Sequence, residues 1–114
     1  MAHSLITIKK RSTFVYVKDN GKFVRSSSFN LQMLENLDLN RVIAMGYTAT
    51  KKLGNSVVRN KSKRIMRELA RKVISNYGKI NFYYVIIAKS NLLKKPFIEL
   101  KLELKKLIVW ILIW

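Results

Sequence analysis

The segment Gly54 to Leu69, GNSVVRNKSKRIMREL, carries the side chains with the clearest chemical meaning in this sequence. It interleaves Lys, Arg and Asn with Val, Ile, Met and Leu, and it contains one acid, Glu68. Guanidinium, ammonium and amide groups bind anions by charge and hydrogen bonds, and Arg in particular matches the oxygens of a phosphate. The chemistry to expect at this segment is therefore the binding of a polyanion.

A helix is the element that would position these side chains. Asn55 or Ser56 can cap its start, and Gly78 would end it after about Tyr77. At 100° per residue, one face of this helix is suited to a protein core and carries Val58, Ser62, Ile65, Met66, Leu69 and Val73. A second stripe consists of Arg59, Lys63, Arg67 and Arg71, with Asn60 and Arg64 beside it.

The stripe differs from an ordinary solvated helix face in its charge pattern. Solvated faces alternate positive and negative side chains, because like charges four residues apart repel each other. Between Lys51 and Lys72 there are nine basic residues and one acid. This excess favours a surface that faces a polyanion over a face that is merely solvated.

The composition of the whole chain agrees with this interpretation. Its 114 residues predict a single domain, 1–114, and the 23 Lys and Arg against six Asp and Glu give a formal net charge of +17. Such an excess weakens a compact fold by self-repulsion unless a nucleic acid or an anionic membrane compensates it. The absence of Cys excludes disulfides and thiolate metal sites and fits a cytoplasmic protein. The last eight residues, LIVWILIW, are too few for a transmembrane segment, which needs about 20.

Hydrophobic periodicity predicts an α+β sandwich with one sheet. We expect helices at 9–18, 55–77 and 96–110, the last opened by Pro96, and strands at 22–26, 28–34, 41–49 and 81–89. In the second of these strands, Phe29, Leu31 and Met33 alternate with Asn30 and Gln32, which is the period of a half-buried strand.

The sequence shows no set of side chains that would let the polypeptide itself catalyse a reaction. His3 is the only histidine and lies near a chain end that we expect to be frayed. Among the six carboxylates only Glu99 and Glu103 share a helix face, where Lys95 and Lys106 can pair with them. The sequence has no Gly-rich phosphate loop and no nucleophile with a neighbouring base. We predict neither catalytic residues nor a protein metal site.

Several motifs of this chain resemble the protein subunit of bacterial ribonuclease P. Residues 51–67, KKLGNSVVRNKSKRIMR, match the family signature except at Lys61, where the family commonly has Arg. The early RSTF with a glycine seven residues after its Phe, the GYTATKK segment and the late apolar strand also agree. The resemblance covers about residues 8–105, and the apolar tail 107–114 is atypical, since the family usually ends in polar or basic residues.

The resemblance implies a fold and a function. The fold would be an αβββαβα two-layer sandwich with a left-handed βαβ crossover, whereas general rules favour a right-handed one. The function would be that of a subunit of the ribonuclease P holoenzyme, an endoribonuclease that removes the 5′ leader of precursor tRNA. In this family the catalyst is RNA, which binds Mg²⁺ for the hydrolysis, and the protein binds both that catalytic RNA and the single-stranded leader.

The family's functional positions transfer onto residues of this sequence. For binding the catalytic RNA, the motif and the charged stripe together give Lys51, Lys52, Arg59, Asn60, Lys61, Lys63, Arg64, Arg67 and Arg71. For the leader-binding cleft, the candidates are Phe14, Tyr16, Lys18 and Gln32. A second cleft aromatic often follows four residues after the first, where this chain has Lys18, so Tyr16 is the candidate substitute. Core packing is the alternative role for Phe14.

Two other functions remain open at this stage. Charge and fold class also suit a ribosomal or other structured-RNA scaffold protein without a role in tRNA processing. The charge together with the apolar tail suits a peripheral membrane binder, if the tail forms an exposed patch instead of packing on the sheet.

Overall fold

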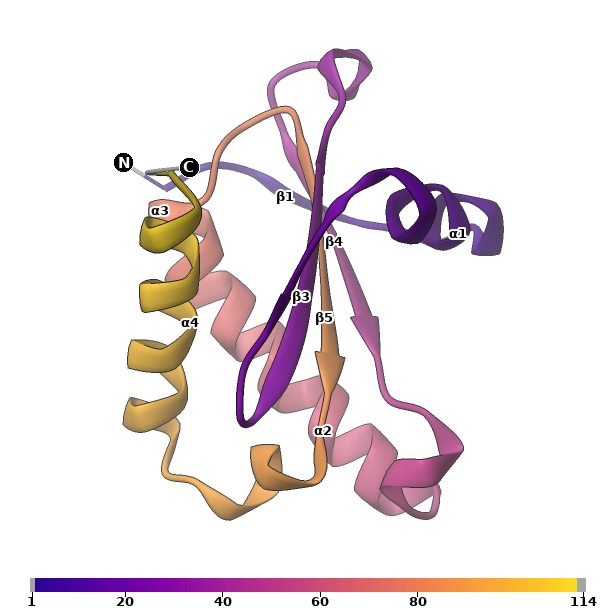
Figure 1. Cartoon of the computed structure of the whole chain (residues 1–114), viewed down its shortest axis with the longest axis vertical. Helices are drawn as coiled ribbons and strands as arrows, with labels where there is room; N and C mark the ends of the chain where they lie inside the picture. Colours follow the sequence, from indigo (N-terminus) through magenta and orange to yellow (C-terminus); the bar gives the residue numbers. More distant parts are fainter. Residues whose placement is uncertain (1, 113–114) are drawn as a thin grey trace.

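The chain folds into a sheet with helices on both faces (Figure 1). The computed structural model describes residues 2–112. The strands are β1 (Leu5–Thr7), β2 (Lys22–Arg25), β3 (Phe29–Glu35), β4 (Ile43–Thr48) and β5 (Phe82–Ala88). The helices are α1 (Arg11–Asn20), α2 (Ser56–Leu69), α3 (Ser75–Tyr77) and α4 (Phe97–Leu112). The predicted α+β class and the order of the main elements are confirmed.

The sheet has the strand order β1-β4-β5-β3-β2. β5 pairs in parallel with β4 and antiparallel with β3, and β2 and β3 form a hairpin. Figure 1 views the sheet nearly edge-on, with the β2–β3 hairpin in front and β4 behind β5, while α2 runs from the lower right to the upper left and covers the same left-hand face of the sheet as α4. β4 and β5 both run downward in this view, and the chain passes from β4 at the back to β5 in front through a helix on the left-hand face of the sheet. This arrangement makes the crossover left-handed, as the resemblance implies.

The main core lies between the sheet and the pair α2 and α4. Phe29, Leu31 and Met33 of β3 face it and are at most 5% exposed, which confirms the predicted alternation. Met66 of α2 and Leu104 of α4 meet them there and are fully buried. Burial of a side chain of this size stabilises the fold by about 1.5–3 kcal/mol. This layer fixes the position of α2 and hence of the charged stripe that α2 carries.

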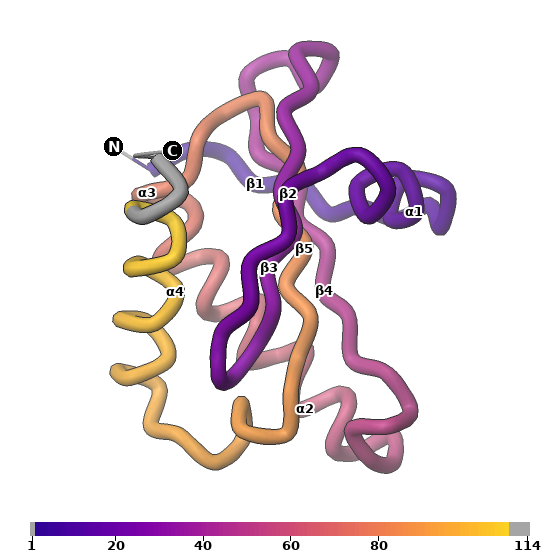
Figure 2. The backbone as a smooth tube through the Cα atoms, in the orientation of Figure 1, coloured from indigo at the N-terminus to yellow at the C-terminus, as the bar shows by residue number. Residues whose placement is uncertain are grey.

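The opposite face of the sheet is covered only in part. A smaller cluster contains Ile8, Val17 of α1, Ala44 of β4 and Val85 of β5, with Phe14 packed against it. The tube in Figure 2 shows α1 projecting on this side of the sheet, away from α2 and α4. The two faces of the sheet therefore differ, one closed by two helices and the other only partly covered.

The predicted helix 55–77 is a continuous helical run with a wider turn inside it. Residues Ala70–Ile74 form a π-helical turn, and the backbone N–H of Ser75 donates to the carbonyl of Ala70. Ala70, Val73 and Ile74 are buried, while Arg71 stays exposed. A wider turn of this kind changes the direction of the side chains that follow it. It separates the long charged part of α2 from the short helix α3.

The first residues of the chain correct the expectation of a frayed end. Leu5–Thr7 form β1, which pairs in parallel with β4 at the edge of the sheet. The backbone N–H of His3 donates to the carbonyl of Ser75 at 2.7 Å. The strand was not predicted because three residues are too few to show a period.

Glu103 of α4 ties the tip of the β2–β3 hairpin to the core. Its carboxylate accepts hydrogen bonds from Ser26 Oγ and from the backbone N–H and hydroxyl of Ser28, both at 2.9 Å. Lys95 Nζ lies 3.0 Å away, which confirms the pairing expected from the sequence. Burial alone would raise the pKa of Glu103, but these hydrogen bonds outweigh it and hold the pKa below its ordinary value.

The apolar tail 107–114 is described only in part. Ile108 is buried against the sheet and Leu107 is half-buried, whereas Val109 is 40% exposed. The side chains from 110 onward lie outside the described residues. In the described part of the chain, no helix combines the length and the apolar character needed to cross a bilayer.

Candidate nucleic-acid interface

The start of α2 is fixed by local hydrogen bonds. Asn55 caps the helix, and its side-chain oxygen accepts from the backbone N–H of Val58 at 3.0 Å. Gly54 precedes it with φ of +151°, a conformation that favours glycine. Ser62 Oγ donates to the carbonyl of Val58 at 2.9 Å, so this polar residue on the core face is satisfied. These contacts fix the start of α2, and the packing of its core face leaves the other side to solvent.

The predicted RNA-binding side chains lie together along α2 and the turn before it. We call this surface the basic ridge; it consists of Lys51, Lys52, Arg59, Asn60, Lys61, Lys63, Arg64 and Arg67. Arg59 and Lys63 are half-buried, and the other members are exposed. Among the described residues, none of its cations lies within salt-bridge distance of a carboxylate. Their charge is therefore available to a partner.

Arg71 differs from the members of the ridge. Its Nη2 lies 2.6 Å from Oε2 of Glu68, one turn earlier on the same helix. Both side chains are well exposed, so the pair adds little to stability. The pair nevertheless neutralises Arg71, the last residue of the predicted stripe, whereas the earlier cations of the stripe have no such partner among the described residues.

Arg67 and Arg59 have different surroundings within the ridge. The Arg67 guanidinium lies 5.9 Å from the centre of the Tyr47 ring, a cation–π distance. Burial raises the pKa of Tyr47, and the charge of Arg67 offsets this in part, so its hydroxyl stays protonated at neutral pH. Arg59 Nε is buried without a hydrogen-bond partner in the described part of the chain. A buried donor of this kind costs stability unless a ligand supplies an acceptor.

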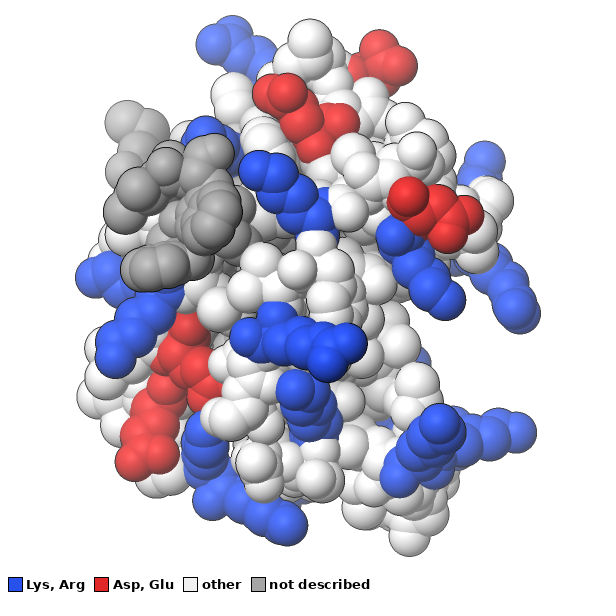
Figure 3. Space-filling model, in the orientation of Figure 1, with Lys and Arg blue, Asp and Glu red and all other residues white. Residues whose placement is uncertain are grey.

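The predicted leader cleft lies beside α1 on the half-covered face of the sheet. Phe14 packs over Gly46 so closely that a Cβ at that glycine would lie 2.5 Å from Phe14 Cε1. Gln32 lies on the same sheet face and is 8% exposed. Tyr16 and Lys18 are exposed on α1. The outline of the molecule in Figure 3 is indented between α1 and the segment that begins α2, so the cleft side opens toward the basic ridge.

The structure brings Phe14 and Gln32 to one face but does not join Tyr16 to Phe14. Two residues apart on a helix, their side chains point about 200° apart. Tyr16 is 50% exposed and Phe14 is half-buried in the α1 cluster. The structure therefore shows that Phe14 packs on the sheet, and its role in binding the leader stays a prediction.

Three residues of this face, Phe23, Arg25 and Asn30, were not predicted from the sequence as site residues. Phe23 of β2 is 48% exposed and pairs in register with Gln32, and the Arg25 guanidinium lies 5.7 Å from the Phe23 ring centre. Arg25 pairs with Asn30, whose side-chain oxygen is buried without a partner among the described residues. The alternation in KFVR was the available signal, because it places Phe23 and Arg25 on one face.

Among the described residues, metal ligands do not gather on this surface. In residues 2–112, no three His, Asp or Glu side chains are placed to hold one ion. The donors of the interface are instead cationic, amide and aromatic groups, which suit phosphates and bases.

Comparison with known proteins places the chain in a family. The family model described as Ribonuclease P matches residues 3–111. The ribonuclease P protein component of Thermoanaerobacter sp. (strain X514) is 34% identical over 110 residues, which are 96% of this chain and 91% of that protein. The chain belongs to the ribonuclease P protein family. Members of this family are subunits of the ribonuclease P holoenzyme, an endoribonuclease that processes the 5′ leader of tRNA precursors.

Other relatives support the family assignment and the fold. The component from Caulobacter vibrioides (strain NA1000 / CB15N) is 35% identical over 82 residues, 72% of this chain and 54% of that protein. The RNase P protein of Staphylococcus aureus superposes with a TM-score of 0.75 at 25% identity, covering 92% of this chain and 93% of that one. The protein from Thermotoga maritima gives 0.77 at 23% identity, with 90% and 94% covered, and supports the fold alone. The chain is thus a ribonuclease P subunit and not a scaffold protein without a role in tRNA processing.

Proposed function

We propose that the basic ridge binds the catalytic RNA of ribonuclease P and that the cleft beside α1 binds the single-stranded leader of precursor tRNA. The observation that carries the proposal is a set of ridge cations that have no acidic partner among residues 2–112, held by a capped helix whose other side is buried. Phosphates of a folded RNA would supply the missing counterions.

The cleft contributes groups of a different kind. Phe14 and Phe23 offer aromatic faces for stacking, and Gln32 and Asn30 offer amides for base edges. Stacking on an aromatic ring accepts any base, so this surface suits leaders of different sequence. Because the cleft opens beside the ridge, one RNA could hold the protein while another strand crosses the cleft.

The hydrolysis itself is assigned to the RNA. When bound, Mg²⁺ would activate water and stabilise the leaving oxygen. The described side chains do not form a ligand set for it, so we propose that the RNA holds the ion. The protein's own groups bind and orient RNA strands in this scheme. We propose the cytoplasm as the place of action.

Reconstitution with the cognate RNA at low Mg²⁺ tests this proposal. We expect faster cleavage of a tRNA precursor than with the RNA alone. The variant Arg64→Ala/Arg67→Ala should lose most of this gain with an unchanged circular dichroism spectrum, whereas Arg71→Ala, a matched arginine on the same helix, should retain it. No gain by the wild-type protein, or equal losses in both variants, would contradict the proposal.

A further inference from the structure

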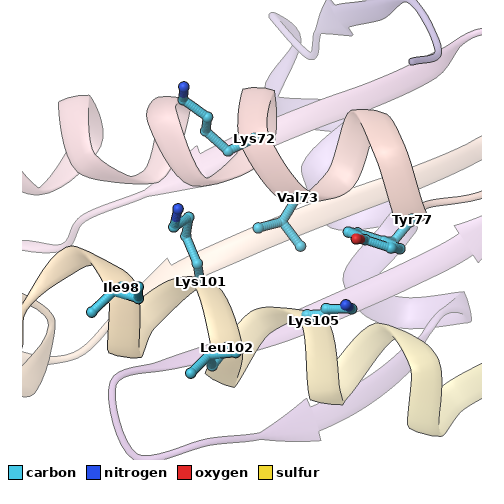
Figure 4. Close-up of a pocket in the computed structure, with 7 residues that line it drawn as sticks. All are labelled: Lys72, Val73, Tyr77, Ile98, Lys101, Leu102 and Lys105. Carbon is cyan, nitrogen blue, oxygen red and sulfur yellow. The ribbon is translucent and has the colours of Figure 1, made fainter. Parts of the chain in front are cut away.

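A second surface lies on the side of the molecule away from the cleft, between the end of the α2 run and α4. It is a groove of about 270 Å³, which we call the lysine groove. Its lining residues are Lys72, Val73, Tyr77, Ile98, Lys101, Leu102 and Lys105. In Figure 4, Lys101 extends from α4 toward the helix above it, and Lys105 lies beside the Tyr77 ring.

The groove combines exposed apolar side chains with positive charge. Ile98 and Leu102 are 63% and 54% exposed, and Tyr77 is 42% exposed. Lys105 Nζ lies 4.5 Å from the centre of the Tyr77 ring, which is a cation–π distance. None of the lining residues is acidic, and none of the three lysines is within salt-bridge distance of an acid in the described residues.

α4 is apolar on two opposite sides. Leu100, Leu104 and Ile108 face the sheet and are at most 2% exposed. The opposite side carries Ile98 and Leu102, followed by Val109 at 40% exposure. Lys101, Lys105 and Lys106 flank this outer stripe, and Glu99 is the one acid on the exposed part of the helix. A helix with a single core-facing side does not need an outer apolar stripe.

We propose that the lysine groove and the outer stripe of α4 bind an anionic phospholipid surface. Apolar side chains with lysines on both flanks are typical of helices that lie in a membrane interface, where lysine stems cover apolar surface and the ammonium groups reach the phosphates. The sequence continues after Val109 with WILIW, and Trp favours the membrane–water interface. The surface is on the opposite side of the sheet from the cleft, so a protein bound to leader RNA could still present it (Figure 1).

Two other occupants fit less well. A second copy of this chain would bring another net charge of +17 against the lysines. RNA would satisfy the lysines but would leave the aliphatic side chains of Ile98 and Leu102 without an apolar partner. Both occupants are separate outcomes of the experiment below.

Flotation of the full-length chain with lipid vesicles, alone and bound to its cognate RNA, tests this proposal. Phosphatidylglycerol-containing vesicles should carry the protein in both states, and pure phosphatidylcholine vesicles should not. Ile98→Ser/Leu102→Ser and Lys101→Glu/Lys105→Glu should each weaken the binding roughly tenfold or more. Leu37→Ser/Val57→Ser and Lys9→Glu/Lys94→Glu are matched controls on other surfaces and should bind nearly as wild type.

Precursor cleavage by the reconstituted holoenzyme should be unchanged in both groove variants, which separates this surface from the proposed RNA interface. The proposal is overturned if the folded wild-type protein does not float with anionic vesicles. It is also overturned if the control Lys9→Glu/Lys94→Glu loses as much vesicle binding as the groove variant Lys101→Glu/Lys105→Glu. It is also overturned if RNA displaces the protein from vesicles. Finally, it is overturned if the apolar variant changes only self-association, measured by sedimentation velocity.

Discussion

Replacement of Arg64 should reduce the salt dependence of RNA binding, whereas replacement of Arg71 should leave it nearly unchanged. The two residues occupy the same helical run and carry the same side chain. Arg64 is exposed and has no acid within salt-bridge distance in the part of the chain that the structure describes, while the Arg71 guanidinium lies 2.6 Å from Glu68. The comparison therefore separates free from compensated charge on one helix.

The expected size follows from the release of counterions. Each phosphate neutralised by the protein changes the slope of log affinity against log salt by about −0.7 to −0.9. If the basic ridge engages about five phosphates, the slope of the wild-type protein is roughly −3 to −5. Arg64→Ala should make it shallower by about one contact, and Arg64→Ala/Arg67→Ala by about two. Arg71→Ala should change it by much less than one contact.

The assay is titration of labelled cognate RNA by fluorescence anisotropy at a series of salt concentrations and fixed Mg²⁺. Glu68→Gln provides the reciprocal variant, since it frees Arg71 and should steepen the slope by up to one contact. The same shallowing in Arg71→Ala as in Arg64→Ala, or a flat response of the wild-type protein, would refute this account of the interface.

Three further perturbations test other parts of the structure. Phe14→Ala should weaken binding of precursor tRNA by about 1–3 kcal/mol without affecting tRNA that lacks a leader; equal effects on both would argue for a packing role alone. Gly46→Ala should displace the Phe14 ring, since the added Cβ would lie 2.5 Å from it, and should cost about 1–3 kcal/mol in denaturant unfolding. This loss should shrink in Phe14→Ala/Gly46→Ala, and an undiminished loss would point to another cause. Glu103→Gln should lower the free energy of unfolding by about 1–3 kcal/mol at neutral pH, because Ser26, Ser28 and Lys95 lose a charged acceptor. The pKa of Glu103 in the folded protein lies below its ordinary 4.5, so the advantage of the wild type is full above that pH. It should disappear as the pH falls through the folded pKa, and a difference that persists in acid would contradict the role of the carboxylate.

Local periodicity explains which parts of the fold could be predicted. The alternation of Phe29, Leu31 and Met33 and the helical spacing of Ser62 and Met66 both depend on near neighbours, and both face the core as expected. β1 could not be found in this way, because Leu5–Thr7 form a strand only by pairing with β4, far along the chain. The left-handed crossover was expected from family resemblance, since general rules favour the other hand.

The residue types of the candidate interface could be predicted from the sequence, but the partners of individual side chains could not. Glu68 has Arg64 four residues before it and Arg71 and Lys72 three and four residues after it, and the sequence does not choose among them. The folded helix selects Arg71. Likewise, the alternation of residues 22–25 does not predict which residues of β3 pair with Phe23 and Arg25. The register of the hairpin places Phe23 beside Gln32 and Arg25 beside Asn30.

The first turn of α2 indicates that positive potential is maintained at this end of the helix. Acidic side chains stabilise a helix N-terminus by about 0.3–1 kcal/mol, because they offset the positive end of the helix dipole. The first turn of α2 contains none, and the cap is the neutral amide of Asn55. Arg59 and Lys61 follow immediately, so the dipole and the side chains add to one another. An aspartate at this cap would satisfy the same N–H of Val58 and would stabilise the free helix, but it would also repel a phosphate. The neutral cap therefore gives up a local stabilisation that a bound RNA phosphate can supply.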